Sequence, residues 1–266
     1  MEIELPSHFE IEYEPENQKY YSEPYKSSLK NIILKESEGY CMYCGKRILI
    51  DDSDFSHVEH SVDKKGNFNQ EDELFLEHCK FNLAVACPKC NLVYKKKIEK
   101  IDISDYKNKE CDEICGEECK DYLKLKDEYQ KRNYMYIAPG GYKKGNLYAT
   151  ISYDLIKNRY VPSDSTLKDD ELTFITNNQI DRFALNEEMF SFSITDTCGM
   201  IIDLIDSGID DCERIVFLLK RMKYDNILGV KFIDYLSKIV HNNKVLTAKK
   251  LRDMCEMILI LDLVSL

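Results

Sequence analysis

Two short cysteine motifs, Cys41-Met-Tyr-Cys44 and Cys87-Pro-Lys-Cys90, decide how the first half of this chain folds. Each motif turns the chain tightly enough for both of its sulfurs to reach one ion. One such pair could equally be a redox pair, but two pairs around one compact segment favour a metal site in a reducing cell. The sequence therefore predicts a structural Zn²⁺ site with four thiolate ligands: Cys41, Cys44, Cys87 and Cys90.

The chain has 266 residues, which is enough to bury a core and to form about two modules, since roughly 100 to 200 residues per domain is usual. No charged and then apolar leader begins the sequence, and no apolar run has the length of a membrane span. We therefore expect a cytoplasmic protein without a membrane partner. Its eleven cysteines are expected to be zinc ligands or free thiols instead of disulfides.

The charge of the whole chain opposes nucleic-acid binding by bulk electrostatics, because the net charge is −11, with 48 acidic and 37 basic residues. Basic residues nevertheless gather around the cysteine motifs. A basic run is typical of a solvated helix face or of phosphate contact, and its position directly after Asn91 favours phosphate contact. The residues concerned are Lys46, Arg47, Lys64, Lys65, Lys89, Lys95, Lys96, Lys97 and Lys100.

The segments around the cysteines predict two strands followed by a helix. An apolar stripe predicts a helix from Pro24 to about Glu38 that leads into the first motif. Alternating residues predict strands over 47–50 and 55–62, joined as a hairpin by the turn 51–54. A further helix is expected from Asn91 to about Ile101. This order predicts an α+β protein with a treble-clef-like ββα arrangement held by one metal ion.

The polar residues in this frame resemble those of the HNH nucleases, the His-Me finger group. Glu59-His60 resembles that family's acid and histidine at the end of its first strand, and Asn82 resembles its middle asparagine. Asn91 lies where the family's last histidine or asparagine begins the helix. The cysteine motifs match the zinc-bearing branch of the family, and the resemblance covers roughly residues 27–100.

This resemblance implies a ββα-metal nuclease that hydrolyses phosphodiester bonds of nucleic acid, DNA more than RNA. His60 is then the base that activates water, and Asn82 orients the active loop or the imidazole. Glu59 and the side-chain carbonyl of Asn91 are the implied ligands of a catalytic Mg²⁺ or Mn²⁺, because these ions prefer oxygen. The chain departs from the usual pattern in carrying glutamate instead of aspartate at position 59.

A narrower resemblance is to the PtuB-like HNH proteins of Septu and retron anti-phage systems. It rests on Tyr40-Cys-Met-Tyr-Cys44, on His57-Val-Glu-His60 followed by Asp63-Lys64, and on Asn82-Leu-Ala-Val-Ala-Cys-Pro-Lys-Cys-Asn91. In those systems the nuclease works beside an ABC-type ATPase, so the resemblance implies a PtuA-like partner and a role in antiviral defence. Such a partner would explain how an acidic nuclease reaches nucleic acid.

Two features near this segment leave alternatives open. His57 is a second catalytic group, a ligand of a substrate phosphate, or a strand residue on the same side as Glu59; with Lys64 and Lys95 it is a candidate for substrate binding. Three further cysteines recur every four residues, which on a helix would place them on one stripe. Gly116 and the missing fourth ligand favour a plain stripe over a second metal or redox site. These cysteines are Cys111, Cys115 and Cys119.

A zinc-stabilised module that binds nucleic acid or protein without cutting is the alternative to a nuclease. Such a module needs the cysteines and the basic surface, but it has no use for Glu59, His60 and Asn91 together. The presence of all three in the expected order favours the enzyme.

The chain changes character beyond residue 130. Short β-like runs at 134–138, 147–153 and 159–161 predict a small β annex, and helical stripes after about Asn177 predict a mainly α-helical C-terminal region. We therefore divide the chain into an N-terminal arm, residues 1–26, a zinc-stapled nuclease domain, residues 27–130, and a C-terminal domain, residues 131–266. The apolar last segment, residues 257–266, is a candidate surface for docking a partner.

Overall fold

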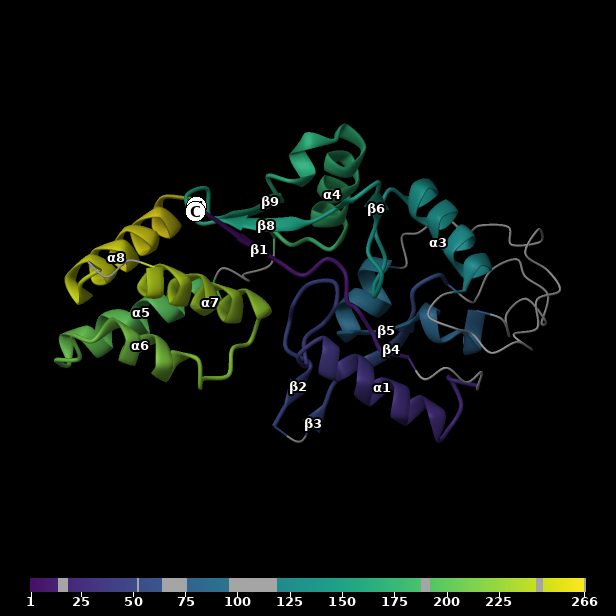
Figure 1. The fold of residues 1–266 in the computed structure, drawn as a ribbon, viewed down its shortest axis with the longest axis horizontal. Coiled ribbons are helices and arrows are strands. Elements are labelled where there is room, and N and C mark those ends of the chain that lie inside the picture. The colour runs from purple at the N-terminus through teal and green to yellow at the C-terminus, as the bar shows by residue number, and fades with distance from the viewer. Residues whose placement is uncertain are drawn as a thin grey trace.

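The computed structural model describes residues 1–13, 19–51, 53–63, 76–95, 119–187, 192–242 and 246–265. It is a mixed α+β protein with a helical C-terminal region. Figure 1 shows the cysteine-bearing segment beside helix α1 at one end, a small sheet with helix α4 in the middle, and helices α5 to α8 at the other end.

Helix α1 (Tyr25–Glu36) matches the helix expected before the first cysteine motif. Its apolar stripe buries Leu29, Ile33 and Leu34, and the helix packs against the buried strand β5 (Leu83–Ala86). Backbone bonds from Ser37 and Gly39 back to the last turn close the helix before the first motif begins. The stripe thus fixes where the first motif lies relative to β5.

The strand pairing differs from the predicted hairpin. β2 (Leu49–Ile50) pairs only with β3 (Ser53–Asp54), whereas β4 (His57–His60) pairs antiparallel with β5. All four residues of β5 are fully buried, so a partner strand gains far more there than beside the exposed residues of β2. The strand, strand, helix order is therefore β4, β5 and the helical turn Cys90–Tyr94.

The first strand of the N-terminal arm belongs to the sheet of the β annex. β1 (Glu2–Glu4) pairs with β8 (Ile151–Asp154), which pairs with β9 (Arg159–Pro162) in the order β1-β8-β9. A separate small hairpin joins β6 (Lys143–Lys144) to β7 (Leu147–Tyr148). The predicted run 134–138 forms no strand: Tyr134 is exposed, and residues 135–138 are buried in the core from an irregular segment.

Six further helices complete the described part of the chain. α5 packs closely on α8, and α7 packs on α6 and α5. Asp169 caps α4 and Asp211 caps α6, each by accepting two backbone N–H bonds of the first turn. Among the described residues, no helix has both the length and the apolar character needed to cross a membrane. The helices are α3 (Lys120–Asn133), α4 (Asp170–Arg182), α5 (Phe192–Asp206), α6 (Cys212–Leu219), α7 (Ile227–Asn242) and α8 (Ala248–Ser265).

The segment before α7 joins the helical region to the first cysteine motif. The amide of the buried Asn226 donates to the carbonyl of Cys44 at 3.0 Å, and the backbone N–H of Ile227 donates to the carbonyl of Gly45 at 2.8 Å. Gly45 has a φ of +69°, and a Cβ there would lie 2.3 Å from the Ile227 side chain. A glycine is therefore required for this close approach.

The join predicts a stability effect at Asn226. Asn226→Ala leaves the buried Cys44 carbonyl and the Leu228 N–H without their amide partner, so we expect the free energy of unfolding to fall by about 1–3 kcal/mol. Chemical denaturation measures this loss. Asn178→Ala is the control, because that amide makes one exposed bond to the Phe174 carbonyl; an equal loss in both variants would contradict the role of Asn226.

Candidate metal centre and adjacent polar site

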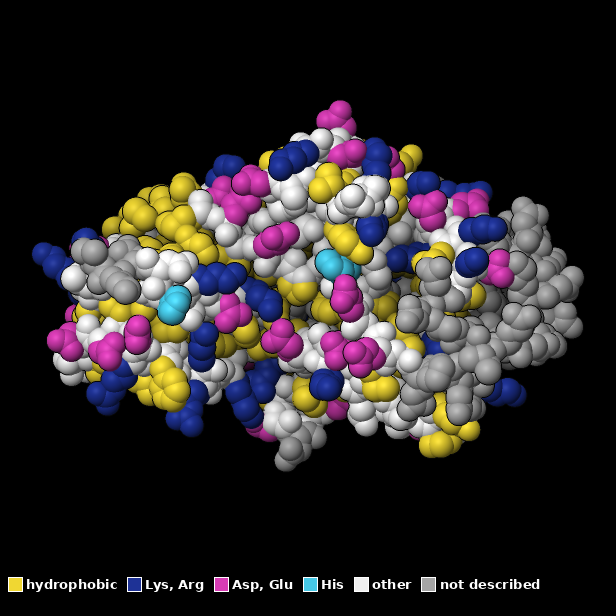
Figure 2. Space-filling view, viewed as in Figure 1, with side chains coloured by type: hydrophobic (Ala, Val, Ile, Leu, Met, Phe, Trp, Pro, Cys, Tyr) yellow, Lys and Arg dark blue, Asp and Glu magenta, His cyan; other side chains and the backbone are white. Residues whose placement is uncertain are grey.

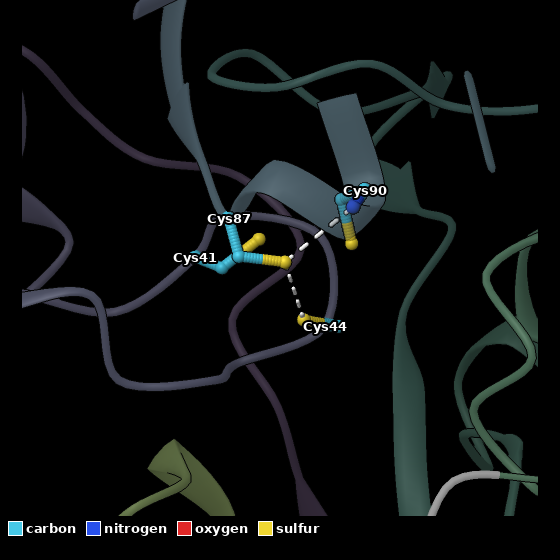
Figure 3. A group of neighbouring side chains, drawn as sticks. All are labelled: Cys41, Cys44, Cys87 and Cys90. Atoms are coloured by element: carbon cyan, nitrogen blue, oxygen red, sulfur yellow. Dashed lines mark hydrogen bonds between the residues drawn. The ribbon is translucent and has the colours of Figure 1, made fainter. Parts of the chain in front are cut away.

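The four cysteines of the two motifs converge on one point (Figure 3). All are buried, and their sulfurs lie within 4.8 Å of one another, with Cys44 Sγ 3.7 Å from Cys87 Sγ. Tetrahedral ligands with Zn–S bonds of about 2.3 Å have sulfurs roughly 3.8 Å apart. The donor set and its spacing therefore fit a structural metal ion such as zinc.

Short backbone bonds shape each motif around its sulfurs. The N–H of Gly45 donates to the Cys41 carbonyl at 2.9 Å, and the N–H of Cys41 donates to the Lys46 carbonyl at 2.8 Å. In the second motif the N–H of Cys90 lies 3.4 Å from Cys87 Sγ. These turns direct the sulfurs of each motif toward one point.

The thiols also influence one another. Hydrogen bonds from Cys41, Cys44 and Cys90 lower the pKa of the Cys87 thiol, while bonds to Cys41, Cys44 and Cys87 raise the pKa of Cys90. These shifts in pKa favour the thiolate form at Cys87 and the protonated thiol at Cys90. Zinc must displace thiol protons, so its affinity falls as the pH falls.

Zinc content tests this centre directly. Cys44→Ser removes one of four ligands, so we expect the purified protein to lose its one bound Zn²⁺ and most of its folding stability, because structural zinc contributes folding free energy. Inductively coupled plasma mass spectrometry and circular dichroism measure the two effects. Cys212→Ser at the start of α6 should keep both. A zinc-free Cys44→Ser protein with parental stability would contradict a structural role.

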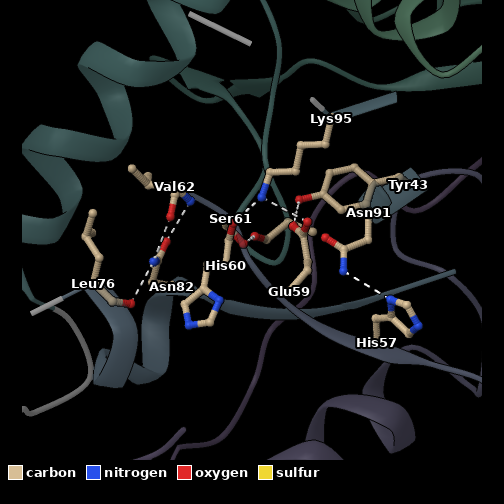
Figure 4. Close-up of polar contacts among 11 residues, drawn as sticks. Tyr43, His57, Glu59, His60, Ser61, Val62, Leu76, Asn82, Asn91 and Lys95 are labelled. Atoms are coloured by element: carbon tan, nitrogen blue, oxygen red, sulfur yellow. Dashed lines mark hydrogen bonds and ion pairs between the residues drawn. The ribbon is translucent and has the colours of Figure 1, made fainter. Parts of the chain in front are cut away.

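A buried ion pair lies on β4 next to the metal centre (Figure 4). Lys95 Nζ lies 2.9 Å from Glu59 Oε2 and also donates to the His60 carbonyl, while the Tyr43 hydroxyl donates to Glu59 Oε1. The side chain of Glu59 is completely buried. Burial first, and then the charge of Glu59, raise the pKa of Tyr43, so its hydroxyl stays protonated as a donor.

His57 and Asn91 face each other across the same side of β4. The amide Nδ2 of Asn91 lies 3.3 Å from His57 Nδ1, and both residues are half-buried. Alternation along β4 places His57 and Glu59 on one face, as one of the sequence alternatives for His57 expected. The helical turn Cys90–Tyr94 thus brings Asn91 and Lys95 to His57 and Glu59.

His60 points to the opposite face of β4. Its Nε2 lies 3.2 Å from the Glu77 carbonyl, and the edge of its ring meets Tyr21 with centroids 4.5 Å apart. Only 8% of the residue is exposed. Glu59 and His60 therefore lie on different sides of the strand, and Glu59 lies on the side that faces Asn91.

Asn82, at the end of a 3₁₀ turn (Lys80–Asn82), binds backbone groups on both sides of a segment outside the described residues. Its side-chain oxygen accepts the N–H of Val62 at 2.7 Å, and its amide donates to the carbonyls of Val62 at 3.0 Å and Leu76 at 2.9 Å. Asn82 therefore holds the chain in place directly after β4.

The two residues expected to hold a catalytic Mg²⁺, Glu59 and Asn91, have other partners in this arrangement. Both oxygens of Glu59 are already bound, one by Tyr43 and one by Lys95, and the Asn91 amide nitrogen is turned to His57. Within the described ranges, the only group of three or more acidic, histidine or cysteine donors close enough for one ion is the cysteine cluster.

The expected substrate-binding residues have different outcomes. Lys95 was predicted to contact substrate, but it is 4% exposed and bound to Glu59, so a phosphate cannot reach it in this arrangement. Lys95 directly follows the helical turn Cys90–Tyr94, and its side chain extends to the buried Glu59 of β4 instead of into solvent. Lys64, Cys111 and Cys115 lie outside the described residues, as do Lys65, Lys96, Lys97 and Lys100. Cys119 is partly buried just before α3.

Tyr43 and Asn226 are site residues that the sequence did not indicate. Tyr43 sits between two zinc ligands, where nothing in the spacing shows that its hydroxyl reaches Glu59. Asn226 lies 182 residues from its partner Cys44, and only the folded chain brings them together. Comparisons of the chain with protein-family models, with curated proteins and with solved structures give no match.

The buried pair predicts a large stability effect. Lys95→Met leaves the Glu59 carboxylate buried without its cation, so we expect a loss of about 3–5 kcal/mol in the free energy of unfolding at neutral pH. Adding Glu59→Gln to Lys95→Met should recover most of the loss, because no buried charge remains. Denaturant titration of both variants measures this coupling, and equal losses in the single and double variants would refute it.

Proposed function

We propose that this chain is an HNH-type endonuclease that hydrolyses phosphodiester bonds of nucleic acid, with DNA the preferred substrate. One observation carries the proposal. A β4–β5 hairpin and the helical turn after it, joined through the cysteine cluster, bring His57, Glu59 and Asn91 together on one side of β4, with His60 on the other. The resemblance assigns Glu59, His60, Asn82 and Asn91 to such a nuclease in this chain order, and His57 is an additional polar residue beside Asn91.

The chemistry requires a base for water and donors for the phosphate. An imidazole accepts a proton near neutral pH, and His60 is the base that the resemblance implies. His57 is a second imidazole whose position beside Asn91 suits it to orient a phosphate or a water molecule. The Asn91 amide can donate a hydrogen bond to a phosphate oxygen. Asn82 contributes by holding the backbone after His60.

A divalent ion, Mg²⁺ or Mn²⁺, is the finer part of the proposal, and it rests on the resemblance. The ammonium of Lys95 already supplies positive charge at Glu59, where the resemblance puts the ion. Cleavage is therefore to be measured with each ion and with neither.

A PtuA-like ABC-type ATPase is the proposed partner, in an anti-phage assembly. The C-terminal helix offers such a partner apolar surface, because Met257, Ile260 and Leu263 are each at least 45% exposed. A partner that gathers nucleic acid would also offset the repulsion from a chain of net charge −11. Co-purification with an ATPase tests this part independently of cleavage.

The competing function is a zinc-stabilised module that binds nucleic acid or protein without cutting. The buried Glu59–Lys95 pair favours it, since a carboxylate held by lysine can serve structure alone. The His57–Asn91 contact favours the enzyme, because two half-buried polar groups that face each other at a strand edge add little to stability.

DNA cleavage distinguishes the two functions. We expect the zinc-loaded protein, alone or with its ATPase, to cut supercoiled plasmid or single-stranded DNA in Mg²⁺ or Mn²⁺, and His60→Ala to lower the rate by about 10²- to 10⁴-fold with zinc content unchanged. His57→Ala and the remote His241→Ala are the paired variants, and His241→Ala should cut as the parent does. If His57→Ala greatly lowers the cleavage rate and His60→Ala does not, His57 is the general base instead of His60. No cutting by folded protein under any condition would favour the binding module.

A further inference from the structure

A cleft of about 780 Å³ lies between the cysteine motifs and the helical region. Its walls come from both motifs, from Phe55 before β4, from the start of α5 and from the segment 222–226 before α7. Its volume is in the range of roughly 300–1,000 Å³ that ligand sites occupy. Cys44, Cys87 and Cys90 of the metal centre line one wall of the cleft, and the residues of its other walls belong neither to that centre nor to the His57–Asn91 contact.

The cleft is basic in an acidic protein. Four cationic side chains line it, Lys46, Arg47, Lys89 and Lys223, against two acidic ones, Asp196 and Asp225. Lys46 is exposed, and among the described residues its ammonium has no ion-pair partner. Lys223 pairs with Asp51 at 2.6 Å, but both side chains are largely exposed, so that pair is weak. Figure 2 shows basic side chains gathered where the β2–β3 hairpin approaches the C-terminal helices.

Aromatic side chains lie among these cations. Phe55 is 56% exposed and Phe192 is 49% exposed, although both are large and apolar, and Tyr94 lines the cleft beneath Lys89, whose Nζ is 5.4 Å from the ring centroid. Exposed rings beside cations suit a ligand that combines flat apolar groups with negative charge. A single-stranded nucleic acid has both, since its bases stack on aromatic side chains while its phosphates meet lysine and arginine. A duplex keeps its bases stacked inside and offers these rings no partner.

The cleft is lined in part by residues that are neighbours, along the chain, of the proposed nuclease site. Phe55 precedes His57 by two residues, and Tyr94 belongs to the same helical turn as Asn91. We propose that this cleft binds single-stranded nucleic acid, with Phe55 and Phe192 stacking on bases and Lys46 and Lys89 contacting phosphates. The proposal deepens the proposed function, on which its link to cleavage rests, and it assigns the strand a path that leads to His57 and Asn91.

Binding can be measured apart from cleavage. Fluorescence anisotropy with a labelled twelve-nucleotide oligo(dT) or oligo(rU), the full zinc-loaded chain and no added divalent ion gives the affinity over a range of salt concentrations. We expect the Lys46→Glu/Lys89→Glu variant to bind at least tenfold more weakly, with the slope of log Kd against log salt reduced by about 0.7 for each lost contact. Phe192→Ala should weaken binding by roughly 5- to 150-fold.

Matched controls lie outside the cleft. Lys249→Glu on α8 makes the same charge change for one residue, and Phe174→Ala on α4 removes a ring that is also exposed, at 52%. Both should bind as the parent does, and zinc content and circular dichroism confirm that every variant is folded. Cleft variants that bind as tightly as these controls would overturn the proposal.

Two competitors test the class of ligand. A duplex of the same sequence that bound as tightly, with equal sensitivity to Phe192→Ala, would overturn the assignment to single strands. A poly-glutamate peptide that displaced the oligonucleotide at equal concentration would assign the cleft to an acidic protein instead. Binding in the cleft without any cleavage would leave this inference standing and refute the nuclease. If the cleft variants both cleave and bind as the parent does, this inference is refuted and the proposed nuclease stands.

Discussion

The convergence of four buried cysteines on one point, where they could hold a metal ion such as zinc, is the constraint on which the rest of the site depends. Zinc binding contributes about 10–16 kcal/mol in small zinc-stapled peptides, as much as the whole net stability of about 5–15 kcal/mol of an ordinary protein. The second motif follows β5 directly and starts the helical turn that carries Asn91. The first motif carries Tyr43 to Glu59 and receives Asn226 from the helical region. Loss of the ion would therefore release the strand, the turn and the domain contact together.

β4 contributes to two polar pairs: Glu59 with Lys95, which is buried, and His57 with Asn91, which is half-buried. Glu59 is completely buried and bound by Tyr43 and Lys95, so its charge is compensated inside the protein. Breaking such a pair is costly, but the pair itself adds little net stability, because both ions lose their water. His57 on the same face stays half-buried and meets Asn91 near the surface. The Glu59–Lys95 pair therefore fixes the turn that carries Asn91, and the His57–Asn91 pair is left accessible to a ligand.

Local patterns in the sequence predicted what depends on neighbours along the chain. The motif spacing predicted the cysteine cluster, and apolar stripes predicted α1 and the C-terminal helices. Strand pairing was predicted less well, since alternation marks a strand but does not choose its partner; β4 pairs with the buried β5 and not with β2. Residue type and position also could not show that Lys95 turns inward to Glu59 or that β1 joins β8. Each of these depends on burial, which only the assembled core determines.

The distribution of charge is compatible with the proposed polyanionic ligand, although the chain is acidic. With a Debye length of about 8 Å at physiological salt, distant acidic residues are screened, and a strand in the cleft responds mainly to the side chains that line it. Those include four cations and two acids, whereas the chain as a whole has net charge −11. The acidic remainder still slows the approach of nucleic acid from a distance and weakens binding elsewhere on the surface. Local attraction with overall repulsion favours a ligand that is delivered to the cleft over one that is captured by diffusion. The proposed nuclease, working beside a partner that gathers nucleic acid, would receive its substrate in this way.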